Sequence, residues 1–389
     1  MVTSNEVAEA TQHIDLVANT RLQELDKVLI TNSKEDYITP LSLTKFSVGA
    51  KGYKVAIPLD RSCVHVKDLT CSKLFLTKYL TELGGNGLVR YARLMHSRQQ
   101  FDLLVENVNR QIQEVDKAFM VRTHRPYGKC GNEADVRIAR ALLSPSFKRL
   151  DDDFVFPVVA KALESVSGQG YPEFIYLGGR NTGEKTYARY VSKDPVLVVG
   201  KREIRVGFQV TNSEVGMSGF VIEFFLCDDF CENGMIFGME GLDLFYMKHS
   251  GKRMRTIVPG IMSHDPFITQ HERYDMEVKI QDRIFSMVSP NMIDSIKNVV
   301  ECSFDRKFYK DPEDVIEKFG TFYELTADEI ELAKQEFIDG ENHAYGLQAA
   351  ITKAGQQSLS FDRRSELDRI GGKIVEQSDA QWEKLILAA

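Results

Sequence analysis

The strongest constraint on the fold is a pair of alternating segments in the middle of the chain. Every second residue is apolar over residues 204–210, and the same alternation returns over residues 220–226. Successive side chains of a strand point to opposite faces, so this period of two indicates half-buried β-strands. The residues between the two segments have loop chemistry, and we therefore expect an antiparallel hairpin.

Helical periodicity lies on both sides of this β-rich middle. Apolar residues recur at helical spacing over residues 6–30, 68–83 and 100–116, and a capping box at Thr326 and Glu329 begins a helix in the last third. Because helices and strands are segregated along the chain, the sequence predicts an α+β fold rather than a doubly wound sheet. We expect a central, mostly antiparallel sheet, N-terminal helices and a helical C-terminal region.

The charges are unevenly distributed along a chain whose net charge is −7. Residues 121–210 hold 15 basic and 10 acidic residues, whereas residues 301–389 hold 11 and 19. A basic segment in an acidic protein is typical of an anion-binding face, although ordinary solvated surface is the alternative. Charge and periodicity together predict three regions: a helical and mixed region 1–117, a basic β-rich core 118–300 and an acidic helical region 301–389.

Motifs for catalysis or for a cofactor are not found in the sequence. It contains no P-loop, GxSxG or HExxH pattern, and Cys227, Cys231 and His249 supply three of the four ligands that a structural zinc site needs. We therefore expect no cofactor, no metal and no catalytic residues, which favours a binding protein over an enzyme. A metal-dependent nuclease is a third hypothesis.

Cysteine usage and hydropathy bear on the compartment. The six cysteines include no CxxC pair, and no apolar run reaches the roughly 18 residues of a membrane span. The first ten residues are polar and acidic, unlike a secretory signal. We expect reduced thiols, a cytoplasmic location and no membrane partner.

Basic residues with tyrosines between them are the candidate nucleic-acid contacts. Basic side chains along a groove hold phosphates and aromatic faces stack on bases, although packing is the alternative role for the tyrosines. The candidate contacts are Arg122, Arg140, Lys148, Arg149, Arg180, Lys185, Arg189, Lys201, Arg202, Lys252, Arg253 and Arg255. We expect those from Arg180 onward, Lys185 and Arg189 on one strand face among them, to form a single positive face or groove.

Four segments, in this order, resemble signatures of the phage/plasmid-like proteins that carry a domain of unknown function. Residues 139–152 resemble RAxLSxxYxxxDN, with Phe147 in place of Tyr and Asp152 in place of Asn. Residues 211–218 resemble NSexGxss, and residues 231–235 resemble CxNGm. Residues 344–352 resemble xyGLxNAiT, with Gln348 in place of the usual Asn.

The resemblance implies a gene carried by phages, prophages or plasmids, without a settled activity. Together with the basic middle it suggests a mobile-element protein of the bacterial cytoplasm that binds nucleic acid, most of all single-stranded DNA, without catalysis. Strand annealing or a recombination accessory role fits, and a homo-oligomer is the expected protein partner. The alternative is a protein-interaction or host-defence-countering factor that uses the acidic C-terminal region.

The signature residues also have purely structural interpretations. Asn212 can cap a turn, Gly216 can supply a positive φ, and Asn233 with Gly234 forms a standard tight-turn pair. The signature residues that we single out are Asn212, Ser213, Gly216, Cys231, Asn233 and Gly234.

Overall fold

The computed structural model describes residues 34–50, 52–59, 66–124, 137–167, 171–200, 202–229, 233–238, 245–249, 260–261, 270–358 and 360–387. The helix expected over residues 6–30 lies outside the described residues. The same holds for five of the singled-out residues: Lys201, Cys231, Lys252, Arg253 and Arg255.

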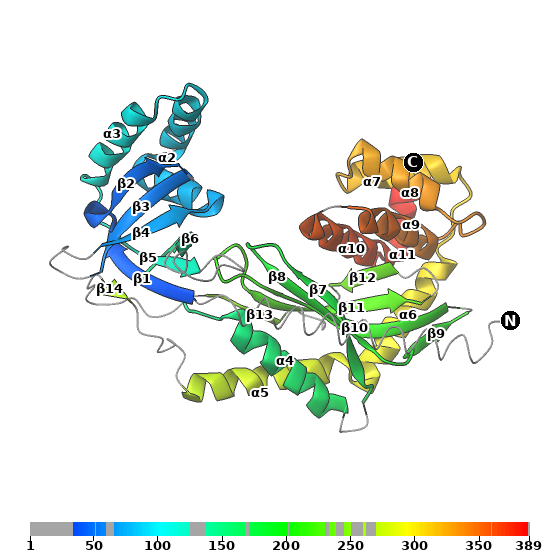
Figure 1. The fold of residues 1–389 in the computed structure, drawn as a ribbon. Coiled ribbons are helices and arrows are strands. Elements are labelled where there is room, and N and C mark those ends of the chain that lie inside the picture. The colour runs from blue at the N-terminus through cyan, green and yellow to red at the C-terminus, as the bar shows by residue number, and fades with distance from the viewer. Residues whose placement is uncertain are drawn as a thin grey trace.

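The first lobe is a seven-stranded sheet with two helices on one face (Figure 1). The strand order is β14-β1-β5-β6-β4-β3-β2, and all neighbours are antiparallel except the parallel pair β4 and β6. The strands are β1 (Lys34–Pro40), β2 (Lys45–Gly49), β3 (Gly52–Pro58), β4 (Val66–Cys71), β5 (Ala118–His124), β6 (Arg137–Leu143) and β14 (Gly260–Ile261), with a 3-10 turn η1 (Leu41–Leu43) after β1.

Helices α2 (Lys73–Ser97) and α3 (Phe101–Ile112) cover the apolar face of this sheet. The core between the helices and the sheet contains Phe46, Val55 and Phe75. Gly84 and Gly85 leave helical geometry and kink α2, which continues beyond the end of the helix expected over residues 68–83. Gly85 has φ +65°, which glycine adopts without steric cost.

The second lobe is built on a separate antiparallel sheet of order β12-β11-β10-β8-β7, with β9 on β10 and β13 on β11. The hairpin predicted from the alternating segments is confirmed, since β10 pairs with β11 and places Phe208 opposite Phe224. The strands are β7 (Phe174–Asn181), β8 (Thr186–Ser192), β9 (Leu197–Val199), β10 (Arg202–Asn212), β11 (Phe220–Asp228), β12 (Asn233–Phe237) and β13 (Phe245–Met247).

Helices lie on both faces of this second sheet (Figure 1). One face is apolar, and its Val206 and Phe208 share a core with residues of α4, α5 and α6. The other face lies under α9 and α10 and combines buried polar residues, such as Arg189 and Gln209, with a small apolar cluster around Phe225. A Cβ at Gly372 of α10 would lie 1.9 Å from the Ile236 carbonyl oxygen, so glycine permits the close approach of α10 to β12. The helices are α4 (Asp152–Ser167), α5 (Gln270–Met287), α6 (Pro290–Asp305), α7 (Pro312–Phe322), α8 (Ala327–Glu336), α9 (Ala344–Gln356), α10 (Phe361–Val375) and α11 (Asp379–Leu387).

The fold is α+β, as the segregated pattern predicts. It differs from the expected layout in having two sheets instead of one central sheet, and its described N-terminal part begins with strands. The boundary expected between residues 117 and 118 runs through the first sheet, because β5 pairs with β1 and β6 pairs with β4. Among the described residues, none of the helices has the length and apolar character to span a membrane.

Candidate nucleic-acid interface and the lobe junction

Two of the four signature segments meet where the lobes join. The segment that begins on β6 and ends in α4 packs against the turn between β10 and β11. Gly216 of that turn has φ +79°, as the turn interpretation predicts, and a Cβ there would lie 2.8 Å from Leu143 Cδ2. The first two segments therefore form one contact between the lobes, the lobe junction.

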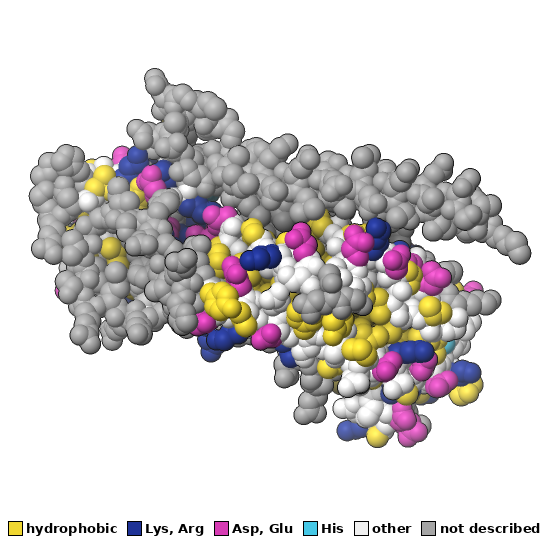
Figure 2. Space-filling view, turned by 90° about the horizontal axis from the view of Figure 1, so that it is seen from below, with side chains coloured by type: hydrophobic (Ala, Val, Ile, Leu, Met, Phe, Trp, Pro, Cys, Tyr) yellow, Lys and Arg dark blue, Asp and Glu magenta, His cyan; other side chains and the backbone are white. Residues whose placement is uncertain are grey.

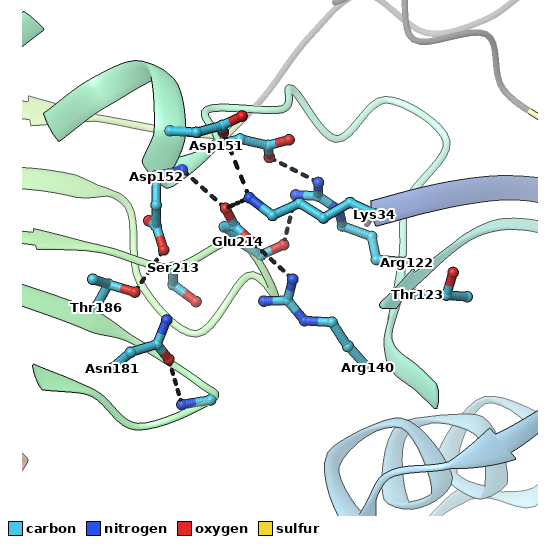
Figure 3. Close-up of polar contacts among 12 residues, drawn as sticks. Lys34, Arg122, Thr123, Arg140, Asp151, Asp152, Asn181, Thr186, Ser213 and Glu214 are labelled. Carbon is cyan, nitrogen blue, oxygen red and sulfur yellow. Dashed lines mark hydrogen bonds and ion pairs between the residues drawn. The ribbon is translucent and has the colours of Figure 1, made fainter. Parts of the chain in front are cut away.

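Glu214 is the centre of the lobe junction (Figure 3). Its carboxylate is 2.5 Å from Lys34 Nζ and 2.7 Å from Arg140 Nη1, both of which come from the first lobe. The backbone N–H of Asp152 donates to the same carboxylate at 2.9 Å. Glu214 thus joins β1, β6 and the start of α4 through one buried side chain.

Arg122 is also enclosed in the junction and is 1% exposed. Its guanidinium lies 3.2 Å from Asp36 and 2.7 Å from Asp151, and it donates to the Glu214 carbonyl oxygen at 2.9 Å. Arg149 reaches the other oxygen of Asp36 at 3.3 Å. Arg122, Arg140 and Arg149, three candidate phosphate contacts, are therefore engaged by internal carboxylates.

The two buried carboxylates of the junction titrate in opposite directions. Burial, followed by the negative charge of Glu214, raises the pKa of Asp152 to about 7. Burial also acts to raise the pKa of Glu214, but the charges of Lys34, Arg140 and Arg122 together hold that pKa well below its ordinary range. Asp152 accepts hydrogen bonds from Thr186 at 2.6 Å and from Asn212 at 2.7 Å.

A cavity of about 340 Å³ opens beside these groups. Carboxylate oxygens of Asp151, Asp153 and Glu214 lie within 4.8 Å of one another, a spacing compatible with a divalent cation. The ammonium of Lys34 already lies 2.5 Å from Glu214 and 3.5 Å from Asp153. Because the chain's own cation compensates these carboxylates, the group fits a structural ion-pair network, and we assign no metal to it.

Three further described members of the expected groove pair with carboxylates of the C-terminal region or of β11. Arg189, 4% exposed, lies 2.5 Å from Asp368 of α10, and Lys185 lies 2.6 Å from Asp362. Lys185 and Arg189 therefore share a side of the sheet, as their even spacing predicts, but α10 covers that side. Arg202 is 5% exposed and pairs with Asp228 and Glu341 near the start of α9.

The expectation of one positive face is therefore wrong for the buried arginines. Lys185, Arg189 and Arg202 pair with carboxylates of the acidic C-terminal region, whereas Arg122, Arg140 and Arg149 pair with carboxylates of the lobe junction. Arg180 is exposed on β7, and Lys148 is half-buried, with its backbone carbonyl oxygen 3.0 Å from His249 Nδ1. On the face seen in Figure 2, the described basic side chains are interspersed with acidic ones.

Asn212, Ser213 and Gly234 make contacts within the fold. Asn212 donates to the Leu150 carbonyl and to Asp152, so it clamps two segments together instead of capping its own turn. Ser213 donates to the Glu184 carbonyl at 2.6 Å. The tight turn expected at Asn233 and Gly234 is wrong, because these residues begin β12, and a Cβ at Gly234 would lie 2.2 Å from the Phe225 ring.

Three exposed arginines of α2 and its C-terminal end were not among the sequence candidates. Arg90, Arg93 and Arg98 are exposed, and none forms an ion pair with a described residue. The signal in the sequence is residues 83–101, which contain these three arginines and His96 but no Asp or Glu. We call Arg90, Arg93, His96 and Arg98 the α2 patch.

Comparisons with protein-family models, with curated proteins and with solved structures find no match for this chain.

Proposed function

We propose that this protein binds nucleic acid through the α2 patch. The observation that supports the proposal is the exposure of Arg90, Arg93 and Arg98 without an ion pair to a described residue. A cation without an internal partner is available to a phosphate and releases the phosphate's counterions when it binds. The buried arginines are already paired with carboxylates and would have to break those pairs first.

The spacing of the three arginines suits a nucleic-acid backbone. Arg90 and Arg93 lie three residues apart on one helix face, and Arg98 follows the last residue of α2. At a helical rise of about 1.5 Å per residue, the patch extends over roughly 12 Å. That length corresponds to about three or four phosphates at roughly 3.4 Å along one strand of a duplex.

The setting of this activity is part of the same proposal. The four segments that resemble phage/plasmid-like proteins support a mobile element in a bacterial cytoplasm, with DNA as the nucleic acid. Annealing and recombination accessory roles need a binding surface and no catalytic step. Several copies along one strand would act together in such a role.

The alternative function, an interaction factor with an acidic C-terminal surface, is less favoured by the contacts. Asp362, Asp368 and Glu341 of that region pair with Lys185, Arg189 and Arg202, and Asp368 is buried. These carboxylates are therefore occupied within the chain, and the proposed function does not use them.

Fluorescence anisotropy with a labelled mixed-sequence oligonucleotide tests the proposal. The wild type should bind at low salt and bind more weakly as salt is raised. The triple variant Arg90→Glu, Arg93→Glu, Arg98→Glu should lose at least about tenfold in affinity, because attraction becomes repulsion at three positions.

A matched control separates local from overall charge. Lys279, Lys373 and Lys384 are exposed on α5, α10 and α11, and their triple change to Glu alters the net charge by the same amount. This control should retain most of the wild-type affinity. No binding by the wild type at low salt, or equal losses in both folded triple variants, would contradict the proposal.

A further inference from the structure

The α2 patch contains an exposed imidazole that its neighbours hold in place. His96 Nδ1 lies 2.6 Å from the hydroxyl of Tyr53 on β3. The centroid of the Tyr53 ring is 5.8 Å from that of His96 at 49°, and the centroid of the Phe101 ring is 5.7 Å away at 74°. Neither neighbour lies parallel to the imidazole, and His96 remains exposed while Tyr53 and Phe101 are half-buried.

The fixed ring neighbours Arg93 on the surface of α2, and Arg98 follows it in the chain. Arg93 precedes His96 by three residues, which places both side chains on adjacent positions of one helix face. Arg98 follows the ring by two residues at the end of α2. A ring that is fixed before binding loses little side-chain entropy when a ligand stacks on it. The patch therefore combines cations for phosphates with a fixed aromatic surface.

We propose that His96 is a base-stacking position and that the α2 patch consequently prefers single-stranded nucleic acid to duplex. A single strand presents the faces of its bases, whereas a duplex buries them in its own stack. Arginines alone would hold the phosphates of either form. This inference rests on the proposed function, because a stacked base needs the neighbouring arginines to hold its backbone.

Binding of oligothymidylate and of a mixed-sequence duplex, with the same label and at one salt concentration, tests the inference. The wild type should bind the single strand more tightly. His96→Ala should weaken single-strand binding by about 5- to 150-fold, the effect of removing one stacking side chain, and change duplex binding by less than about twofold. His96→Phe keeps a ring without the imidazole's charge or hydrogen bond, and should restore most of the single-strand affinity.

Two controls test whether the loss of affinity in His96→Ala could come from removing any exposed ring or from unfolding. Tyr309 is 93% exposed and precedes α7 in the C-terminal region, so Tyr309→Ala removes an exposed ring outside the patch. It should leave both affinities unchanged. Circular dichroism of His96→Ala should match the wild type, and its equilibrium constant of unfolding should rise by no more than about tenfold (about 1.4 kcal/mol), because the change removes one surface hydrogen bond to Tyr53.

The outcomes distinguish this inference from the proposed function. Equal wild-type affinity for both forms, together with no effect of His96→Ala, overturns the stacking position and leaves nucleic-acid binding intact. Failure of His96→Phe to restore affinity also overturns stacking. No binding of either form, with binding to anionic lipid vesicles instead, overturns the proposed function itself.

Discussion

Arg122, Arg189 and Arg202 are at most 5% exposed, whereas Arg90, Arg93 and Arg98 are exposed and form no ion pair with a described residue. The first group lies in the basic β-rich part of the chain, the second in a segment whose surroundings are nearly neutral in overall charge. Arginine therefore occurs in two different environments in this protein. The buried group holds elements together, and the exposed group is available to a ligand.

The cost of burying a charge explains the difference. An arginine that leaves water requires an acidic partner and further acceptors, and each of the three buried arginines has at least one carboxylate partner. Removing one partner of a buried ion pair lowers the free energy of unfolding more than replacing both partners by apolar residues does. The comparison therefore predicts large stability effects at the junction and small ones in the α2 patch.

The largest expected effect is on stability at the lobe junction. Glu214→Gln removes the charge that faces Lys34 and Arg140, and should lower the free energy of unfolding by about 3–5 kcal/mol. Urea unfolding measures the change. Glu106→Gln is the control, because Glu106 pairs with Arg110 on the surface of α3, and it should cost less than about 1 kcal/mol. A cost below that value for Glu214→Gln would show that the junction does not depend on this charge.

A smaller effect on the free energy of unfolding is expected at Gly216, in the turn of the lobe junction. Gly216→Ala places a Cβ in the left-handed region and 2.8 Å from Leu143, and should cost about 1–3 kcal/mol. Gly183 has φ +83°, but a Cβ there would have no heavy atom within 4 Å, so Gly183→Ala reports the backbone cost alone. Thermal or urea unfolding of both variants measures the difference. Equal costs would show that the contact with Leu143 is not tight in solution.

The pH dependence of stability tests the buried Asp152. Its folded-state pKa of about 7 lies above its value of about 4 in an unfolded chain, so the folded state keeps a proton that the unfolded state has lost between these values. The contribution of Asp152 to stability is therefore complete below about pH 4. It is lost as pH rises, by up to about 1.4 kcal/mol per pH unit.

Asp152→Asn should remove this loss. The pKa of Glu214 is lowered, so its contribution to stability is complete above the ordinary pKa of a glutamate and is lost as pH falls below that value. Glu214 therefore adds little slope above about pH 5. Urea unfolding at about pH 5, 6 and 7 should show stability falling with pH in the wild type and a flatter dependence in Asp152→Asn. Parallel slopes in the two proteins would contradict a protonated Asp152.

Features that depend on local sequence were predictable. The alternation at residues 204–210 and 220–226 identified the β10–β11 hairpin, because a half-buried strand places an apolar residue at every second position. The capping box at Thr326 and Glu329 is present with both of its hydrogen bonds. The positive φ of Gly216 also follows from its turn.

Features that depend on long-range packing were not predictable from charge blocks. Arg189 looked available because its neighbours are basic, but Asp368 lies 179 positions away in the chain and on top of it in the fold. The α2 patch was missed for a related reason. Residues 1–120 hold 15 basic and 14 acidic residues, and averaging over that length hides a window that contains no acid.

The dependence of nucleic-acid affinity on salt is the most direct test of the central claim that the exposed arginines of the α2 patch contact phosphates. The measurement is the slope of log affinity against log salt for an oligothymidylate, in the wild type and in the triple variant Arg90→Ala, Arg93→Ala, Arg98→Ala. Each lost phosphate contact should reduce the magnitude of the slope by about 0.7, so we expect a reduction of about 2. An unchanged slope in a folded variant would contradict the claim.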